Sequence, residues 1–248
     1  MEKNYLKISR REALVTGITG LSTLLLPSCT RPLPPTYGHI LRMGDALTYM
    51  AHRAFLPEQS LVKEYSFGDI SSFPATGTTN PADTSSKYYS EEYEKLHRTT
   101  FSDWKIWIEG TVAKPGFFSL SELQKMPTKK QITRHTCEEG WTAIAEWTGV
   151  RLGSLLQSVG ILPSARFVNC YAYDGYMESI DLLDAFHPQT ILAYGMNGKD
   201  LLLAHGAPVR LRVETQIGYK SVKYLKRILV TDAFVDQGDT GWSWYTGI

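Results

Sequence analysis

The chain has 248 residues, of which 43% are hydrophobic and 21% charged, and its formal net charge is +1. This composition is ordinary for a globular protein and argues against a disordered, collagen-like or polytopic membrane protein. The near-neutral charge and the absence of a Lys/Arg run in the sequence give no reason to expect a nucleic-acid partner.

Residues 1–29 have the order of an export signal. Arg10 and Arg11 precede a stretch rich in Gly and Thr, which is too short and too weakly apolar to span a bilayer convincingly. The Ser-Arg-Arg opening resembles a twin-arginine signal. Such signals are typical of proteins that fold before export, which is useful when a cofactor must be inserted first. A short N-terminal anchor or an amphipathic helix is the alternative.

The end of this segment, Leu26–Cys29, resembles a lipoprotein box in which Cys29 would be acylated after cleavage. Pro27 stands where a smaller residue is usual, so lipidation stays open. We expect a periplasmic or exported protein that contacts the membrane only through an anchor at Cys29.

The rest of the chain divides into a connecting segment and one domain. Residues 30–69 are predicted to be a tether and an N-terminal segment, because residues 30–38 are rich in Pro. Residues 70–248 are predicted to be a single domain. Residues 71–87 hold Ser, Thr, Gly, Asn and Pro and predict a long loop, and a loop of this length in a compact domain is more often functional than idle.

From residue 103 onward, strand and helix patterns alternate. Residues 103–112 have a strand period that puts Trp104, Ile106 and Ile108 on one side. Ser119 and Glu122 form a capping box that opens a short helix.

Four further segments complete the pattern. Residues 152–159 predict an amphipathic helix that stops at Gly160, and residues 165–173 alternate as a strand. Residues 207–214 alternate with Arg210 and Arg212 opposite three apolar residues, and residues 222–234 add one or two strands. Strands with short helices between them, and no regular βαβ rhythm, predict an α+β domain with a mixed sheet.

Cys137 is the first chemical candidate, within the stretch RHTCEEGW at residues 134–141. No Cys-x-x-Cys or His-Glu-x-x-His motif accompanies it, which argues against a zinc site. A Cys hydrolase requires a base that lowers the pKa of the thiol, and we expect His135 to face away from Cys137. A buried structural Cys is the plainer alternative, but the neighbouring residues are mostly polar. One thiolate bound to a soft metal, with an organic cofactor supplying the other ligands, fits this pattern.

A basic segment is the second candidate. Within residues 205–228, Arg210, Lys220 and Lys223 follow tight turns, and three cations with backbone donors can hold a phosphate. A solvated basic strand is the alternative.

Three segments in combination, residues 133–156, 179–213 and 217–228, resemble the molybdopterin domain of the sulfite oxidase superfamily. The similarity extends from about residue 70 to the C-terminus. It is closest to the bacterial exported branch that includes methionine sulfoxide reductases. The resemblance implies the α+β, mixed-sheet, sulfite-oxidase-type fold and a mononuclear molybdenum–molybdopterin cofactor.

The resemblance also implies roles for individual residues. Cys137 matches the catalytic thiolate that ligates molybdenum, and His205 and Arg210 match positions that contact the pterin and its phosphate. The cofactor-binding turn is matched by Ser221, Val222 and Lys223.

Two further positions match the family less closely. Thr76 stands in a loop where Asn is expected to contact the pterin, and Ala172 stands where another contact arises and offers only its backbone.

Glu138 and Glu139 bear on the substrate. The corresponding segment of sulfite oxidases is basic, whereas carboxylates near the open face of the metal would repel a dianion such as sulfite. Side chains that turn away into salt bridges are the alternative.

We therefore expect an exported oxidoreductase that transfers an oxygen atom, with a small-molecule or protein-bound S- or N-oxide as substrate. A separate haem or quinol-linked membrane protein would exchange its electrons. A molybdopterin-binding protein without turnover, a sulfite-oxidising enzyme and a Cys-dependent hydrolase are the alternatives.

Overall fold

The computed structural model describes residue 47, residues 50–51, 60–76, 79–233 and residue 235. The chain divides into two compact units, residues 1–43 and 44–248, and all described residues belong to the second. The predicted export signal and lipoprotein box lie outside the described residues. Within the described ranges, no helix is long and apolar enough to cross a membrane.

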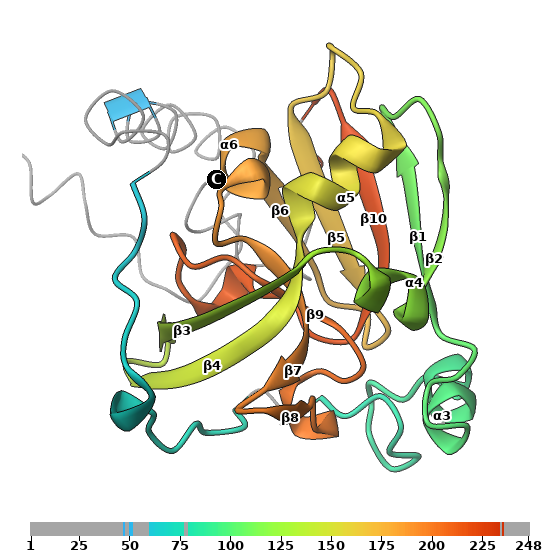
Figure 1. Cartoon of the computed structure of the whole chain (residues 1–248). Helices are drawn as coiled ribbons and strands as arrows, with labels where there is room; N and C mark the ends of the chain where they lie inside the picture. The colour runs from blue at the N-terminus through green and yellow to red at the C-terminus, as the bar shows by residue number, and fades with distance from the viewer. Residues whose placement is uncertain (1–46, 48–49, 52–59, 77–78, 234, 236–248) are drawn as a thin grey trace, which may run out of the picture. The chain divides into compact units, whose positions relative to one another are not determined.

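Two sheets form the framework (Figure 1). The first has the order β2 (Gly116–Ser119), β1 (Lys105–Gly110), β10 (Leu225–Thr231), β5 (Phe167–Ala172) and β6 (Met177–Asp181). The second has the order β3 (Thr128–Thr136), β4 (Thr142–Arg151), β7 (Ile191–Met196) and β8 (Lys199–Asp200), and β9 (Arg210–Arg212) also pairs with β7.

The first sheet is mixed, because β1 pairs with β10 in parallel whereas its other strand pairs are antiparallel. In the second sheet the long β3–β4 hairpin runs in unbroken register from Thr128 opposite Val150 to Thr136 opposite Thr142. Short helices connect the strands, so the predicted α+β fold with a mixed sheet is confirmed.

The helices are short. They are η1 (Phe67–Asp69), α3 (Glu91–Arg98), α4 (Leu120–Lys125), α5 (Leu152–Val159), α6 (Leu182–Phe186), η2 (Leu203–His205) and η3 (Gly218–Lys220). Both predicted helices are present. The capping box predicted for α4 forms, because the Ser119 side chain accepts from the Glu122 N–H and Glu122 Oε2 accepts from the Ser119 N–H at 2.8 Å. The α5 helix ends at Gly160, whose φ is +72°.

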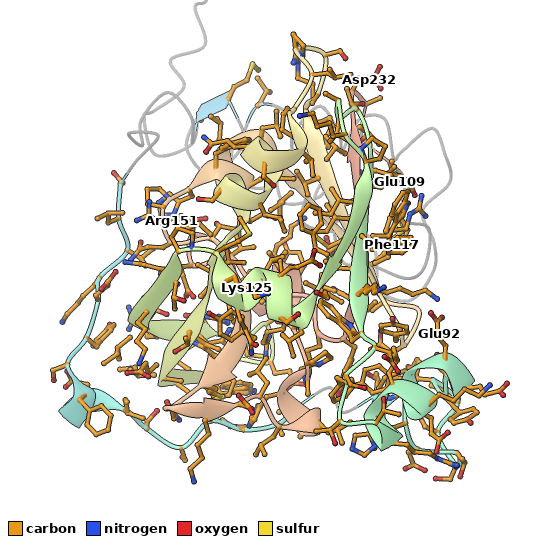
Figure 2. The ribbon with its side chains drawn as sticks, turned by 45° about the vertical axis from the view of Figure 1, so that its right-hand side comes forward. Glu92, Glu109, Phe117, Lys125, Arg151 and Asp232 are labelled. Carbon is orange, nitrogen blue, oxygen red and sulfur yellow. The ribbon has the colours of Figure 1, made fainter. Side chains whose placement is uncertain are left out.

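The α5 helix buries its apolar face against β4, β7 and α6. Its four large apolar residues are almost inaccessible to solvent: Leu152, Leu155, Leu156 and Val159. Burial of each such side chain contributes about 1.5–3 kcal/mol. Figure 2 labels Arg151, where β4 passes directly into α5. The core thus holds the β3–β4 hairpin firmly, and the hairpin turn is part of the candidate site.

The alternative of a solvated basic strand does not apply to Arg210 and Arg212. Both are buried in β9, with exposed fractions of 3% and 1%, and the apolar residues beside them are buried too. A strand that is covered on both faces loses the contrast between its two sides. The alternating residues therefore form a strand, but the alternation does not separate a buried side from an exposed side.

Candidate functional site

A cavity of about 570 Å³ lies where four separate segments meet. The segments are the loop before α3, the end of the β3–β4 hairpin, the β5–β6 turn and the stretch from β9 to η3 and beyond. Its walls are Thr76, Thr79, Tyr88, His135, Cys137, Glu138, Glu139, Asp174, Gly175, Tyr176, Arg210, Gly218, Tyr219, Ser221, Val222 and Lys223.

Cys137 begins the hairpin turn. Its N–H donates to the Trp141 carbonyl at 2.9 Å, and its own carbonyl accepts from the Gly140 N–H at 3.1 Å. Gly140 has φ +91°, a conformation that favours glycine. The thiol lines the cavity although only 7% of the residue is exposed. The local fold therefore presents one cysteine to the cavity from a hydrogen-bonded turn.

Burial raises the pKa of the Cys137 thiol, and the carboxylates of Glu138 and Glu139 raise it further. A thiol in these surroundings is a weak nucleophile, because the reactive form is the thiolate. Binding to a metal cation removes this difficulty, because the cation itself displaces the proton. Cys137 and Cys170 are both free thiols, so they form no disulfide with each other.

The expectation that His135 faces away from Cys137 is wrong, because both residues line the cavity. Residues two apart on an extended strand point to the same side, so the end of β3 brings both to this cavity. Arg212 Nη1 lies 2.6 Å from His135 Nδ1. Burial, with Arg212 and Arg210 nearby, lowers the pKa of His135 to about 2, so its imidazole is neutral.

Arg210 supplies a buried positive charge to the cavity wall. Its Nη1 donates to the His205 carbonyl at 3.1 Å and its Nη2 to the Ser221 carbonyl at 2.9 Å. Its Nε is buried and has no hydrogen-bond partner among the described residues. Burial and the nearby Arg212 lower the pKa of Arg210 to about 9. An anion in the cavity would therefore be favoured here.

Lys223 is the second cation of the wall. Its Nζ donates to the Thr76 carbonyl at 2.7 Å and to the Ala204 carbonyl at 3.1 Å. Burial and Arg210 lower the pKa of Lys223 to about 8.

Lys220 differs, because it lies in the core. Its Nζ contacts Glu178 Oε2 at 3.0 Å and the Ser179 carbonyl at 2.7 Å. The basic segment therefore brings two of its three predicted cations to the cavity, not three.

The other predicted cofactor contacts divide into two groups. Thr76, Ser221 and Val222 line the cavity together with Cys137, Arg210 and Lys223.

His205 and Ala172 are not among the described residues that line it. The His205 ring packs against Phe73 with centroids 5.5 Å apart, and its Nδ1 is buried without a partner among the described residues. The Ala172 N–H donates to the Tyr176 carbonyl, and its carbonyl accepts from the Gly175 N–H.

The β5–β6 turn is a part of the site that was not predicted from the sequence. Asp174, Gly175 and Tyr176 line the cavity, and Tyr176 Oη donates to the Tyr219 carbonyl at 3.0 Å. Asp174 also accepts a hydrogen bond from the Thr79 hydroxyl, which ties this turn to the loop before α3. The Asp-Gly pair after an alternating stretch was the available signal, because it is typical of a hairpin turn.

Glu138 and Glu139 form the acidic side of the cavity and are exposed. Glu138 Oε2 lies 3.6 Å from Cys137 Sγ, and Glu139 Oε2 accepts from Trp141 Nε1 at 3.0 Å. No Lys or Arg of the described part of the chain forms an ion pair with either carboxylate. The cavity thus has carboxylates beside the thiol as well as cations on its wall.

These residues fit molybdopterin chemically. Cys137 offers a sulfur ligand, and Arg210 and Lys223 provide the positive charge that a phosphate requires. The buried Arg210 Nε, which lacks a described partner, is the kind of unsatisfied group that a ligand can occupy. Within the described ranges, no group of three or more His, Cys, Asp or Glu side chains could hold a metal ion.

Comparisons with known proteins agree with this chemistry. Residues 93–237 match the family model of the oxidoreductase molybdopterin binding domain. The chain is 33% identical over 177 residues to a candidate protein-methionine-sulfoxide reductase subunit, YedZ1, of Azospira oryzae. That alignment covers 71% of this chain and 66% of the relative, so the chain spans slightly less than two thirds of the relative's length.

A solved structure supports the fold. The sulfane dehydrogenase SoxCD of Paracoccus pantotrophus matches with a TM-score of 0.52 and 20% identity over 86% of this chain and 59% of that chain. The family match covers more than half of the chain and includes most of the cavity wall, Cys137 among it. The chain therefore belongs to the family of oxidoreductase molybdopterin-binding domains, whose cofactor is molybdopterin with molybdenum.

Proposed function

We propose that this chain is an exported molybdenum–molybdopterin enzyme that reduces a neutral sulfoxide, or a related S- or N-oxide, by oxygen-atom transfer. One observation carries the proposal: a single cavity joins a cysteine, the buried cation Arg210, the half-buried cation Lys223 and an acidic side. The predicted domain of residues 70–248 contains the whole family match, and its boundary at residue 70 remains part of the proposal.

Each part of the cavity has a role in holding the cofactor. Cys137 provides the protein's sulfur ligand to the metal, and Arg210 and Lys223 bind the phosphate by charge-assisted hydrogen bonds. Ser221 and Val222 shape the wall between them. When bound, the molybdenum centre supplies the two-electron chemistry, and the chain's own residues exclude bulk water and orient the substrate.

The acidic side favours a neutral substrate. Glu138 and Glu139 lie at the cavity without an ion-pair partner among the described residues, so a dianion such as sulfite would be repelled. The named activity of the Azospira relative, on protein-bound methionine sulfoxide, supports a neutral oxide. The overall conversion takes an oxide, two electrons and two protons to the deoxygenated product and water.

The electrons would come from a separate partner, a haem protein or a quinol-linked membrane protein. The relative is named as a subunit, which supports a second chain. Export rests on the sequence of residues 1–29, which resembles a twin-arginine signal, with Cys29 as a site for a lipid anchor. Both features support the proposal that the enzyme lies in the periplasm or on the outer side of the membrane.

The test is metal and pterin analysis of protein from a molybdenum-replete host with twin-arginine export. We expect about one molybdenum per chain, and loss of molybdenum in Cys137→Ala. Oxidation of reduced viologen with methionine sulfoxide or dimethyl sulfoxide then tests turnover. Molybdenum without activity on any acceptor would favour a cofactor-binding protein, and metal-free wild-type protein would contradict the proposal.

A charge variant tests the choice of substrate. In Glu138→Gln/Glu139→Gln the repulsion of dianions is removed, so we expect sulfite oxidation to rise relative to sulfoxide reduction. The exposed Glu91→Gln/Glu92→Gln variant of α3 is a matched control for the loss of two negative charges. An unchanged ratio in the cavity variant would contradict the role of the acidic side.

A further inference from the structure

His135 is held by a chain of buried polar contacts that the proposed function does not explain. Arg212 Nε and Nη2 donate to the two carboxylate oxygens of Glu214 at 3.1 and 2.8 Å. Gln131 Nε2 also donates to Glu214 at 3.1 Å, and the Arg212 guanidinium lies 4.4 Å from the centre of the Trp147 ring. These contacts fix the orientation of the Arg212 guanidinium through Nε and Nη2, and they leave Nη1 for His135.

The remaining contact of Arg212 determines the tautomer of His135. Arg212 Nη1 lies 2.6 Å from His135 Nδ1. A guanidinium has only donors, so Nδ1 must be the acceptor. An imidazole whose Nδ1 accepts carries its proton on Nε2. The hydrogen-bond direction alone thus makes His135 a neutral donor through Nε2.

The Nε2 atom lies at a close contact with Gly218. A Cβ atom at Gly218 would be 2.8 Å from His135 Nε2 and 3.0 Å from Glu138 Oε2. His135, Glu138 and Gly218 all line the cavity that contains Cys137. The ring itself is confined, because Phe73 and Trp141 pack against it with centroids 5.2 and 5.5 Å away.

We propose that Glu214 and Arg212 are positioning residues that hold His135 as a fixed, uncharged hydrogen-bond donor to the cofactor that binds beside Cys137. This inference rests on the proposed function for the presence of the metal. A hydrogen bond donated to the cofactor would withdraw electron density from its metal and stabilise the reduced form. The arrangement therefore raises the reduction potential without adding a charge to the substrate face.

The tautomer is tested first, by NMR of the imidazole nitrogens in holoprotein labelled with ¹⁵N-histidine. The signal of His135 is assigned by its loss in His135→Gln. We expect one tautomer, with Nδ1 unprotonated and Nε2 protonated. In the double variant Arg212→Met/Glu214→Gln, which removes the ion pair without leaving a lone buried charge, we expect a mixture. A proton on Nδ1 in the wild type would overturn the inference.

The effect on the metal is tested by potentiometric titration followed by electron paramagnetic resonance. We expect a lower reduction potential in His135→Leu, which has no donor. His135→Gln places an amide N–H near the position of Nε2, so we expect its potential to lie closer to that of the wild type. Equal potentials and equal molybdenum content in His135→Leu and the wild type would overturn the inference.

The two proposals fail in different ways. Wild-type protein without molybdenum would contradict the proposed function and, with it, the donor role, whereas the same NMR measurement on that metal-free protein would still decide whether Arg212 fixes the tautomer. Molybdenum-loaded protein whose potential does not respond to His135 would contradict only the inference.

Discussion

Gly218 leaves no room for a methyl group beside His135. A Cβ atom there would lie 2.8 Å from Nε2 and 2.9 Å from Cε1, and Arg212 prevents the ring from moving away. We expect Gly218→Ala to destabilise the protein by about 1–3 kcal/mol, the usual range for overpacking, and to lower cofactor content. Urea denaturation and metal analysis measure both effects. Gly116→Ala is the control, because a Cβ atom there meets no atom within 4 Å; equal behaviour of the two variants would contradict the close contact.

Arg210 combines two tasks, since it contributes charge to the cavity and joins two loops. We expect Arg210→Ala to weaken cofactor retention by about 1.5–3 kcal/mol for one lost charge-assisted contact. Molybdenum retained after gel filtration is the measurement. Arg151→Ala is a matched control, because Arg151 is exposed at the end of β4 (Figure 2). Full occupancy of the Arg210 variant would count against its role at the phosphate.

Lys223 makes the stability of the cofactor-free protein depend on pH. Its pKa is lowered to about 8, so between pH 8 and 10.5 the unfolded chain binds a proton at Lys223 that the folded chain does not. The contribution of Lys223 to the free energy of unfolding therefore rises with pH in this window. Denaturation of wild type and Lys223→Met at pH 7 and pH 10 measures it. We expect the free energy of unfolding of the wild type, relative to that of the variant, to be larger at pH 10 than at pH 7. The opposite change would contradict the lowered pKa of Lys223.

At the scale of elements, the start of α4 follows from a local sequence signal. Ser119 and Glu122 satisfy each other's backbone N–H groups, which the first turn of a helix leaves without partners. We expect Ser119→Ala to lower the free energy of unfolding by about 1 kcal/mol. Ser164→Ala, at an exposed turn before β5, is expected to have no comparable effect in the same denaturation experiment.

Helix ends were predictable because their signals are local, whereas the β3–β4 hairpin was not. The inward side of β3 carries Gln131, Thr133 and His135, so polar residues replace the apolar alternation that marks a strand. Their burial depends on partners distant in sequence, such as Glu214 and Arg212. The same reason explains why the burial of Arg212, which depends on Glu214 and Trp147, could not be predicted from the sequence.

The candidate site was predictable where a family motif marks it. Six of the predicted site residues line one cavity: Thr76, Cys137, Arg210, Ser221, Val222 and Lys223. His205 and Ala172 do not line it within the described structure, and the cofactor-binding roles of all eight residues remain predictions. Tyr176 and Tyr219 could not be found from the sequence alone, because the bond from Tyr176 Oη to the Tyr219 carbonyl joins segments 43 residues apart.

On the scale of the whole molecule, the cavity extends beyond the segment that matches the family. Thr76, Thr79 and Tyr88 lie before residue 93, where the match begins, yet they line the cavity. The loop predicted at residues 71–87 has no helix or strand at its described positions. A truncation at residue 93 would therefore remove part of the wall.

The export of the whole chain can be tested at the predicted twin-arginine signal. If Arg10 and Arg11 form a twin-arginine signal, Arg10→Lys/Arg11→Lys should trap the precursor in the cytoplasm. Cell fractionation followed by immunoblotting measures the distribution. Lys3→Arg/Lys7→Arg keeps both Arg10 and Arg11 and serves as the control. Undiminished export of the Lys variant would refute this signal, whereas retention of both variants would mean that the segment is sensitive to any change.

The two cations of the cavity also connect separate segments of the backbone by hydrogen bonds. Arg210 binds the carbonyls of His205 and Ser221, and Lys223 binds those of Thr76 and Ala204. Because these hydrogen bonds join residues of the chain itself, the cavity for the pterin can form before the cofactor binds. The cofactor would then bind to a preformed cavity, and the folded chain without cofactor would already be protected from proteases.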